Sequence, residues 1–87
     1  MSEANSAAVT VLFFAAARET AGTSEWRCDP VEGESVAGLK ARVYEAFPSL
    51  RGWARALRFA VDGEYASDDA LVPAGCEVAV IPPVAGG

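Results

Sequence analysis

The 87-residue sequence contains no histidine and only two cysteines. Histidine is the commonest general base in enzymes and the commonest metal ligand in proteins, so its absence argues against catalysis and metal binding within this chain. Two thiols are also too few for a ferredoxin-type iron–sulfur cluster, which takes four. We therefore expect no metal site and no catalytic site of the protein's own.

Long apolar runs and clustered positive charge are absent as well. No segment approaches the ~20 apolar residues of a transmembrane helix, and residues 1–8 lack the basic and hydrophobic regions of a signal peptide. The formal net charge of −5 disfavours nucleic acid as a partner and favours encounter with a basic protein surface. We expect a cytoplasmic protein with a disordered tail at residues 1–8 and no membrane or nucleic-acid partner.

The two cysteines, Cys28 and Cys76, allow three interpretations. They can form a disulfide, handle sulfur as a relay, or act as small apolar residues of the core. Without an export signal the third is favoured, because free cysteine is among the most buried residue types. The other two interpretations stay open.

What is present is the composition of a small globular domain. A chain of this size builds one core and buries only about 60% of its extended surface. Residues 9–14 are β-branched and aromatic on both faces, which predicts a central strand. Residues 15–21 favour a short helix that stops at Gly22, and residues 23–29 alternate as a second strand.

The middle of the chain predicts the main helix. Ser35 is a suitable N-cap, and apolar residues recur after it at helical spacing, namely Val36, Leu39, Val43 and Phe47. Pro48 ends this pattern. Residues 49–56 are expected to form a connection with one irregular helical turn that carries Leu50 and Trp53.

Three short strands are expected after that connection. Residues 57–61 alternate, Asp62-Gly63 supplies a tight turn into a brief strand at 64–66, and residues 77–81 form the last strand. The order of elements predicts an α+β fold, with one main helix packed across a mixed sheet of four to five strands within a domain at residues 9–81. This order resembles the β-grasp arrangement of ubiquitin-like proteins, which implies that the first and last strands lie parallel and adjacent at the sheet centre.

The sequence ends in Pro82-Pro83-Val84-Ala85-Gly86-Gly87, which we interpret as an extended functional tail. The two prolines lack amide donors and fix φ, so they end sheet pairing and leave less entropy to lose on docking. Six residues reach at most ~20 Å, enough to enter a buried pocket. The two glycines carry no β-carbon, so a narrow channel can close around the backbone and present the final carboxylate to a reagent.

Strand alternation predicts a second feature. If Val11, Phe13, Val78 and Val80 face the helix, the opposite face of the two central strands carries another apolar set, namely Leu12, Phe14, Ala79 and Ile81. An exposed apolar patch of this kind marks an interface with another protein. Alternatively, the N-terminal residues or a loop cover it.

Both ends of the sequence resemble one known family. Residues 11–19, V-L-F-F-A-A-A-R-E, resemble the V-L-F-F-A-x-x-R-E opening of the small subunit of molybdopterin synthase, a ubiquitin-like β-grasp family of sulfur carriers. Residues 75–87 resemble its G-D-E-V-A-x-x-P-P-V-x-G-G ending, with Cys76 where the family often has Asp. The resemblance spans nearly the whole chain after residue 8.

The resemblance implies a role for Gly87. An ATP-dependent adenylyltransferase similar to the ubiquitin-activating class would adenylate its carboxylate, and a sulfur donor would convert it to a thiocarboxylate. The tail, with Pro82, Pro83, Val84, Ala85 and Gly86, would enter the large synthase subunit, where sulfur passes to cyclic pyranopterin monophosphate. The chain would bind no cofactor and would act as the sulfur-donating subunit of a heterotetramer, with Arg18 either contacting the partner or remaining a solvated charge.

Three other functions remain open on the sequence alone. The protein can be a ubiquitin-like modifier joined through Gly87 to lysines of other proteins. It can be a sulfur carrier for thiamine synthesis or RNA thiolation, although those carriers typically lack the two motifs quoted above. It can also be a plain protein-interaction domain.

Overall fold

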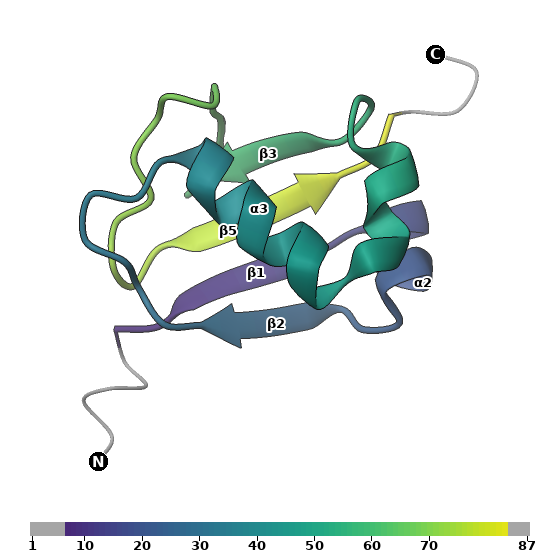
Figure 1. The fold of residues 1–87 in the computed structure, drawn as a ribbon, viewed down its shortest axis with the longest axis horizontal. Helices are drawn as coiled ribbons and strands as arrows, with labels where there is room; N and C mark the ends of the chain where they lie inside the picture. The colour runs from purple at the N-terminus through teal and green to yellow at the C-terminus, as the bar shows by residue number, and fades with distance from the viewer. Residues whose placement is uncertain (1–6, 84–87) are drawn as a thin grey trace.

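The computed structural model describes residues 7–83, which form a five-stranded sheet with one long helix on one face (Figure 1). The α+β prediction and the expected order of elements are confirmed. Within residues 7–83, no helix has the length and apolar character needed to cross a membrane. The elements are β1 (Val9–Phe13), α2 (Ala15–Ala21), β2 (Glu25–Cys28), α3 (Val36–Ala46), the 3₁₀ helix η1 (Pro48–Trp53), β3 (Arg58–Val61), β4 (Glu64–Tyr65) and β5 (Glu77–Ile81).

The sheet has the order β2-β1-β5-β3-β4. Strands β1 and β5 are parallel and central, as expected, with Val11 opposite Val78 and Phe13 opposite Val80. The other pairs are antiparallel. Because β1 and β5 carry apolar residues on both faces, they take central positions in the sheet.

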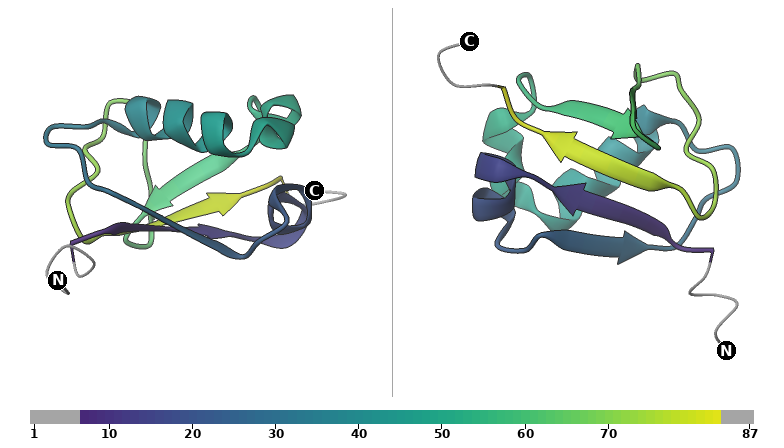
Figure 2. Two further views of the ribbon diagram at one scale, coloured as in Figure 1. Left: turned by 60° about the horizontal axis from the view of Figure 1, so that its bottom comes forward. Right: turned by 180° about the vertical axis from the view of Figure 1, so that it is seen from behind.

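Helix α3 packs across one face of this sheet (Figure 2, left). The Ser35 side chain accepts a hydrogen bond from the Gly38 amide at 3.3 Å, which satisfies one of the unpaired amides at the helix start. The helix then buries Val36, Leu39 and Val43 completely. These side chains meet the core face of the central strands, where Val9, Val11, Val78 and Val80 are fully buried and Phe13 nearly so.

The connection after α3 is more regular than expected. Instead of one irregular turn within residues 49–56, a 3₁₀ helix begins at Pro48 and runs to Trp53. Proline is tolerated at this first helical position because its missing amide would have no partner there. Leu50 is completely buried, so η1 closes the end of the core beside α2.

Four of the five strands are shorter than predicted. Strand β1 ends at Phe13 rather than Phe14. Strand β2 begins at Glu25 rather than residue 23, because the Thr23 hydroxyl donates to the Glu25 carbonyl and forms a local turn instead. Strand β3 begins at Arg58, since the Leu57 amide donates back to Trp53. Strand β4 is limited to Glu64–Tyr65.

The predicted hairpin turn at Asp62-Gly63 has φ values of +49° and +88°. Two successive left-handed residues are typical of the type I′ turn, whose twist matches that of the strands it joins. The Asp62 carboxylate also accepts a hydrogen bond from the Glu77 amide at 2.9 Å. The turn therefore fixes β4 beside β3 and anchors the start of β5.

Candidate functional site

The predicted tail begins at the end of the central strand β5. Strand β5 ends at Ile81, and Pro82 has no amide with which to continue the ladder. Pro82 is buried against the domain, whereas Pro83 is exposed, so the first residue to stand out from the domain is Pro83 rather than Pro82. The remaining predicted tail residues, Val84, Ala85, Gly86 and Gly87, lie outside the described residues.

The sheet face opposite α3 is seen from outside in Figure 2, right, and the strand register assigns the predicted apolar residues to it. Leu12 of β1 pairs in register with Ala79 of β5, and each lies between residues that face the core. Leu12, Ala79 and Ile81 are partly buried, and Phe14 is 46% exposed. The structure therefore brings these four side chains together on the open face, beside the point where β5 ends.

Strands β3 and β4 extend this face with residues that the sequence analysis missed. Ala60 pairs with Ala79 on one side and with Tyr65 on the other, which places all three on the same face. Tyr65 is 67% exposed, and the Arg58 guanidinium lies 5.6 Å from its ring centroid. We call the complete apolar set the open-face patch, and it consists of Leu12, Phe14, Ala60, Tyr65, Ala79 and Ile81.

The open-face patch contains a shallow hollow, and a larger groove continues from it. The hollow has a volume of about 310 Å³ and is lined by Phe14, Ala60, Gly63, Tyr65, Ala79 and Ile81. The groove has a volume of about 660 Å³ and is lined by Phe14, Ala15, Ala16, Trp53, Ile81, Pro82 and Pro83. Phe14 and Ile81 belong to both, so the apolar surface runs without interruption to the root of the tail.

Backbone strain occurs at the edge of this groove. Ala15 has φ of +49°, in the left-handed region that costs a residue with a β-carbon roughly 1–2 kcal/mol. This conformation follows the extended Phe14 and lets helix α2 begin immediately after β1. Arg18, the predicted partner contact, is exposed on α2. The predicted open-face and α2 residues therefore share the end of the molecule from which the tail leaves.

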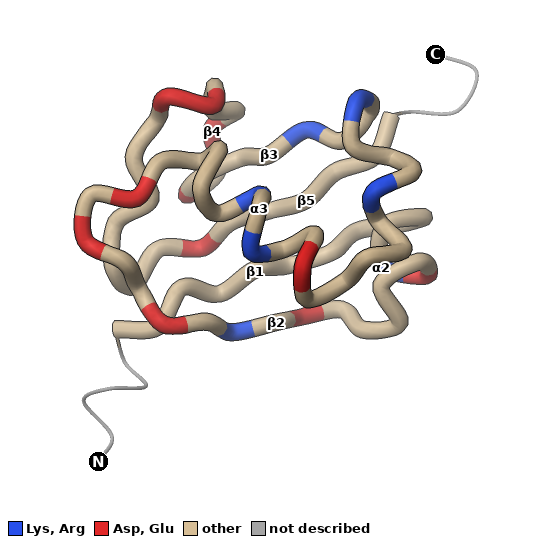
Figure 3. The backbone as a smooth tube through the Cα atoms, viewed as in Figure 1, with Lys and Arg blue, Asp and Glu red and all other residues tan. Residues whose placement is uncertain are grey.

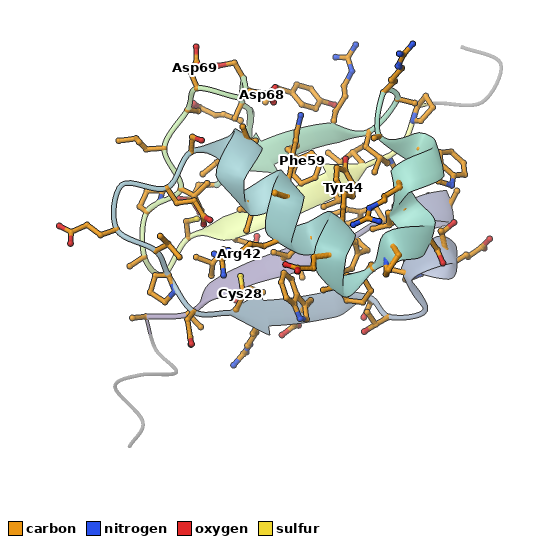
Figure 4. The ribbon with its side chains drawn as sticks, viewed as in Figure 1. Cys28, Arg42, Tyr44, Phe59, Asp68 and Asp69 are labelled. Carbon is orange, nitrogen blue, oxygen red and sulfur yellow. The ribbon has the colours of Figure 1, made fainter. Side chains whose placement is uncertain are left out.

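The two cysteines are free and lie toward the opposite end of the strands. Cys76 is 5% exposed and belongs to the core, which confirms the buried-thiol interpretation for this residue. Cys28 is partly buried under α3 and lies close to Arg42 (Figure 4). Burial raises the pKa of both thiols, and for Cys28 the nearby Arg42 guanidinium partly opposes that rise.

These raised pKa values predict slow reaction of both thiols with iodoacetamide at pH 7, because only the thiolate is the nucleophile. Peptide mass spectrometry should show Cys28 modified before Cys76, and both modified rapidly in urea. Each thiol has a higher pKa in the folded protein than in the unfolded chain. The stability that the protonated thiols contribute is therefore lost as pH rises above the ordinary thiol pKa of about 8.5. Faster reaction of Cys76 than of Cys28 in native buffer would contradict this assignment.

The fold defines a class of protein. A central parallel pair formed by the first and last strands, with one helix packed across one face, is the ubiquitin-like β-grasp arrangement. SAMP1 from Haloferax volcanii, a solved structure, superimposes with a TM-score of 0.80 at 27% identity, covering 92% of this chain and 99% of that chain.

Sequence comparison narrows this class to a family. A model of the ThiS family matches residues 11–87. The molybdopterin synthase sulfur carrier subunit of Chlamydomonas reinhardtii is 36% identical over 81 residues, covering 91% of this chain and 98% of that protein. The corresponding subunit of Arabidopsis thaliana is 32% identical over 85 residues, covering 98% of this chain and 88% of that protein. The chain belongs to the ThiS family and is related to the sulfur carrier subunits of molybdopterin synthase.

Proposed function

We propose that this protein is a sulfur carrier in molybdenum cofactor biosynthesis and serves as the small subunit of molybdopterin synthase. The observation that carries the proposal is the similarity to sulfur carrier subunits over nearly the full length of the chain. The central strand β5 ends beside an apolar groove that residues 7–83 leave open, which is what a carrier that docks on a partner requires.

The proposed reaction takes place on the carboxylate of Gly87. The carboxylate attacks the α-phosphate of ATP in an activating enzyme, and pyrophosphate leaves. A sulfur nucleophile from a donor then attacks the carbonyl carbon of the acyl-adenylate, and AMP leaves, so that sulfur replaces one carboxylate oxygen. In the large subunit this sulfur forms a bond to a carbon of cyclic pyranopterin monophosphate, and water then hydrolyses the bond between the sulfur and the Gly87 carbonyl carbon, which restores the carboxylate. We propose that this cycle takes place in the cytoplasm.

The described residues support this role by docking and positioning the tail. The open-face patch would contact the large subunit, in a complex that we propose contains two copies of each subunit. Pro82 is packed against the domain and Pro83 has a fixed φ, so the tail starts in a restricted direction. Gly86 and Gly87 have no side chains to obstruct a narrow channel. Binding of the pterin and proton transfer would belong to the large subunit.

Intact mass spectrometry tests the proposal. The purified protein is incubated with ATP, a cognate activating enzyme and a sulfur source, and we expect a mass increase that corresponds to the exchange of one oxygen for sulfur. Omitting ATP is the control and should leave the mass unchanged. A mass that stays unchanged with all three components present would refute the proposed carrier chemistry.

A second candidate is a ubiquitin-like protein modifier. The structural similarity to SAMP1 favours it, because SAMP1 is the small archaeal modifier protein 1. That similarity reaches a TM-score of 0.80 over 92% of this chain. A modifier would accumulate in cells as conjugates joined through Gly87 to lysine side chains and released by isopeptide cleavage. Free protein with a thiocarboxylate would instead identify the carrier.

A further inference from the structure

The basic residues of the described chain fall into two groups. Three are held in ion pairs, at N···O distances of 3.0 Å for Arg27–Glu25, 2.7 Å for Lys40–Asp68 and 2.7 Å for Arg42–Glu34. Within residues 7–83 the other four, Arg18, Arg51, Arg55 and Arg58, make no ion pair, and all four are exposed. The unpaired group therefore presents its full charge to solvent.

Three of these unpaired residues gather near the root of the tail. Arg58 lies directly opposite Ile81 in the β3–β5 ladder, next to the end of β5. Arg51 is on η1, whose Trp53 lines the groove together with Pro82 and Pro83, and Arg55 lies between η1 and β3. In Figure 3 the blue segments of η1 and β3 lie at the end of the molecule from which the tail departs. We call Arg51, Arg55 and Arg58 the tail-end arginines.

The acidic residues are concentrated at the other end. Residues 46–61 contain the tail-end arginines and no acidic residue, whereas residues 62–77 contain five acidic residues and no basic one. The β3–β4 turn and the loop before β5 place this second segment at the far end of the strands, where most of the red in Figure 3 lies. The protein is therefore electrically polar, and its net charge of −5 does not describe the end that carries the tail.

Local structure does not account for this grouping. Arg51 lies in the last turn of η1, where a cation is favourable, and Arg58 stacks over Tyr65. Arg55 has neither explanation, and neither effect requires all three arginines to lie in a segment that has no acidic residue. Nucleic acid is also a poor fit, because affinity for it depends on the neutralisation of many phosphates, and only three arginines gather here.

We propose that the tail-end arginines form a docking surface for an acidic rim on the large subunit, around the opening that receives the tail. The inference rests on the proposed function, because it takes the large subunit to be the protein that the tail enters. Complementary charge at this end would orient the carrier during encounter, with the tail first and the acidic end turned away. Steering of this kind raises association rates and weakens as salt screens the charges.

The test compares two variants with the same net charge. In the first, Arg51→Gln, Arg55→Gln and Arg58→Gln remove the three charges, which changes the formal charge from −5 to −8. In the control, Val31→Glu, Ser67→Glu and Ala74→Glu add three carboxylates at exposed positions of the acidic end, which also gives −8. The association rate constant with purified large subunit is measured by stopped-flow tryptophan fluorescence between about 0.05 and 0.5 M salt.

We expect the arginine variant to associate about tenfold more slowly than wild type at low salt and to lose most of the salt dependence. The control should stay within about twofold of wild type. Equal rates for wild type and the arginine variant, or equal slowing of both variants, would overturn the proposal. So would a duplex oligonucleotide that binds wild type but not the arginine variant at 0.15 M salt, because it would assign the surface to nucleic acid.

Two further readouts separate this proposal from the proposed function. If the arginine variant associates normally while sulfur transfer still depends on Gly87, only the docking proposal fails. If wild type neither binds the large subunit nor acquires sulfur, the proposed function fails and the docking proposal fails with it. Thermal unfolding of both variants shows whether the compared proteins are equally folded.

Discussion

A variant that lacks Gly86 and Gly87 is expected to fold normally and to transfer no sulfur. The core side chains of the terminal strand, Val78 and Val80, lie well before the deletion, and Pro82 packs on the domain at the last buried position described. The deletion removes the reacting group itself, so the loss of synthase activity should exceed the roughly 10²-fold that a misplaced reacting group costs. The readouts are synthase turnover and the thermal unfolding midpoint.

A substitution that keeps the terminus tests the reason for the glycines. Gly86→Val retains the carboxylate of Gly87 but adds a β-branched side chain that a narrow channel would have to exclude. We expect it to prevent thiocarboxylate formation or transfer, whereas Val84→Ile, three residues from the end, should have a much smaller effect. If cells that carry the double-glycine deletion still make molybdenum cofactor, the proposed function is wrong.

The sequence allowed the two faces of the central strands to be predicted, because side chains alternate with a strict period of two. Once Val11 and Val78 are assigned to the core, Leu12 and Ala79 must face the other way, and the register confirms this arrangement. The main helix could also be predicted from the sequence, because its cap at Ser35 and its apolar spacing depend only on local sequence. Whether the open face binds a partner stays a prediction.

Features that depend on pairing between distant strands were harder to predict from the sequence. Tyr65 joins the open-face patch only because the two-residue turn sets Ala60 opposite Tyr65, and β3 in turn pairs with β5. The charge separation is visible in the sequence as two adjacent segments of opposite sign. The separation of these segments in space could not be predicted without the fold, because only the antiparallel course of β3 and β5 shows that they lie at opposite ends of the strands.

Two local departures have a steric origin that composition does not reveal. Ala15 adopts a left-handed conformation although alanine strongly prefers negative φ, because β1 passes directly into α2 without a glycine between them. Pro82 is buried although it follows the last strand residue, and it lies beside Ala15 and Ala16 of α2 and Trp53 of η1, which line the same groove. The sequence correctly indicated that pairing stops at Pro82, but not that the residue packs against the domain.

The second large effect is expected from Ile81→Asp, which should leave a folded monomer with greatly weakened binding to the large subunit. Ile81 is partly buried and lines both the hollow of the open-face patch and the groove at the root of the tail. In the free protein the new carboxylate would be solvated and would lie across the ladder from Arg58. In the complex this carboxylate would be desolvated. We expect the binding free energy to weaken by at least about 2 kcal/mol, which is roughly 30-fold in Kd.

A second carboxylate on the same face serves as the control. Thr10→Asp introduces the same charge on β1, between the partners Arg27 and Glu77 and at the end of the sheet away from the tail. Titration calorimetry against the large subunit should show binding by Thr10→Asp close to that of wild type, while Ile81→Asp binds weakly and both variants retain a cooperative unfolding transition. Equal Kd values for the two folded variants would mean that the surface around Ile81 lies outside the interface. The tail would then have to supply most of the binding free energy, and deletion of its glycines would weaken binding as severely as it weakens sulfur transfer.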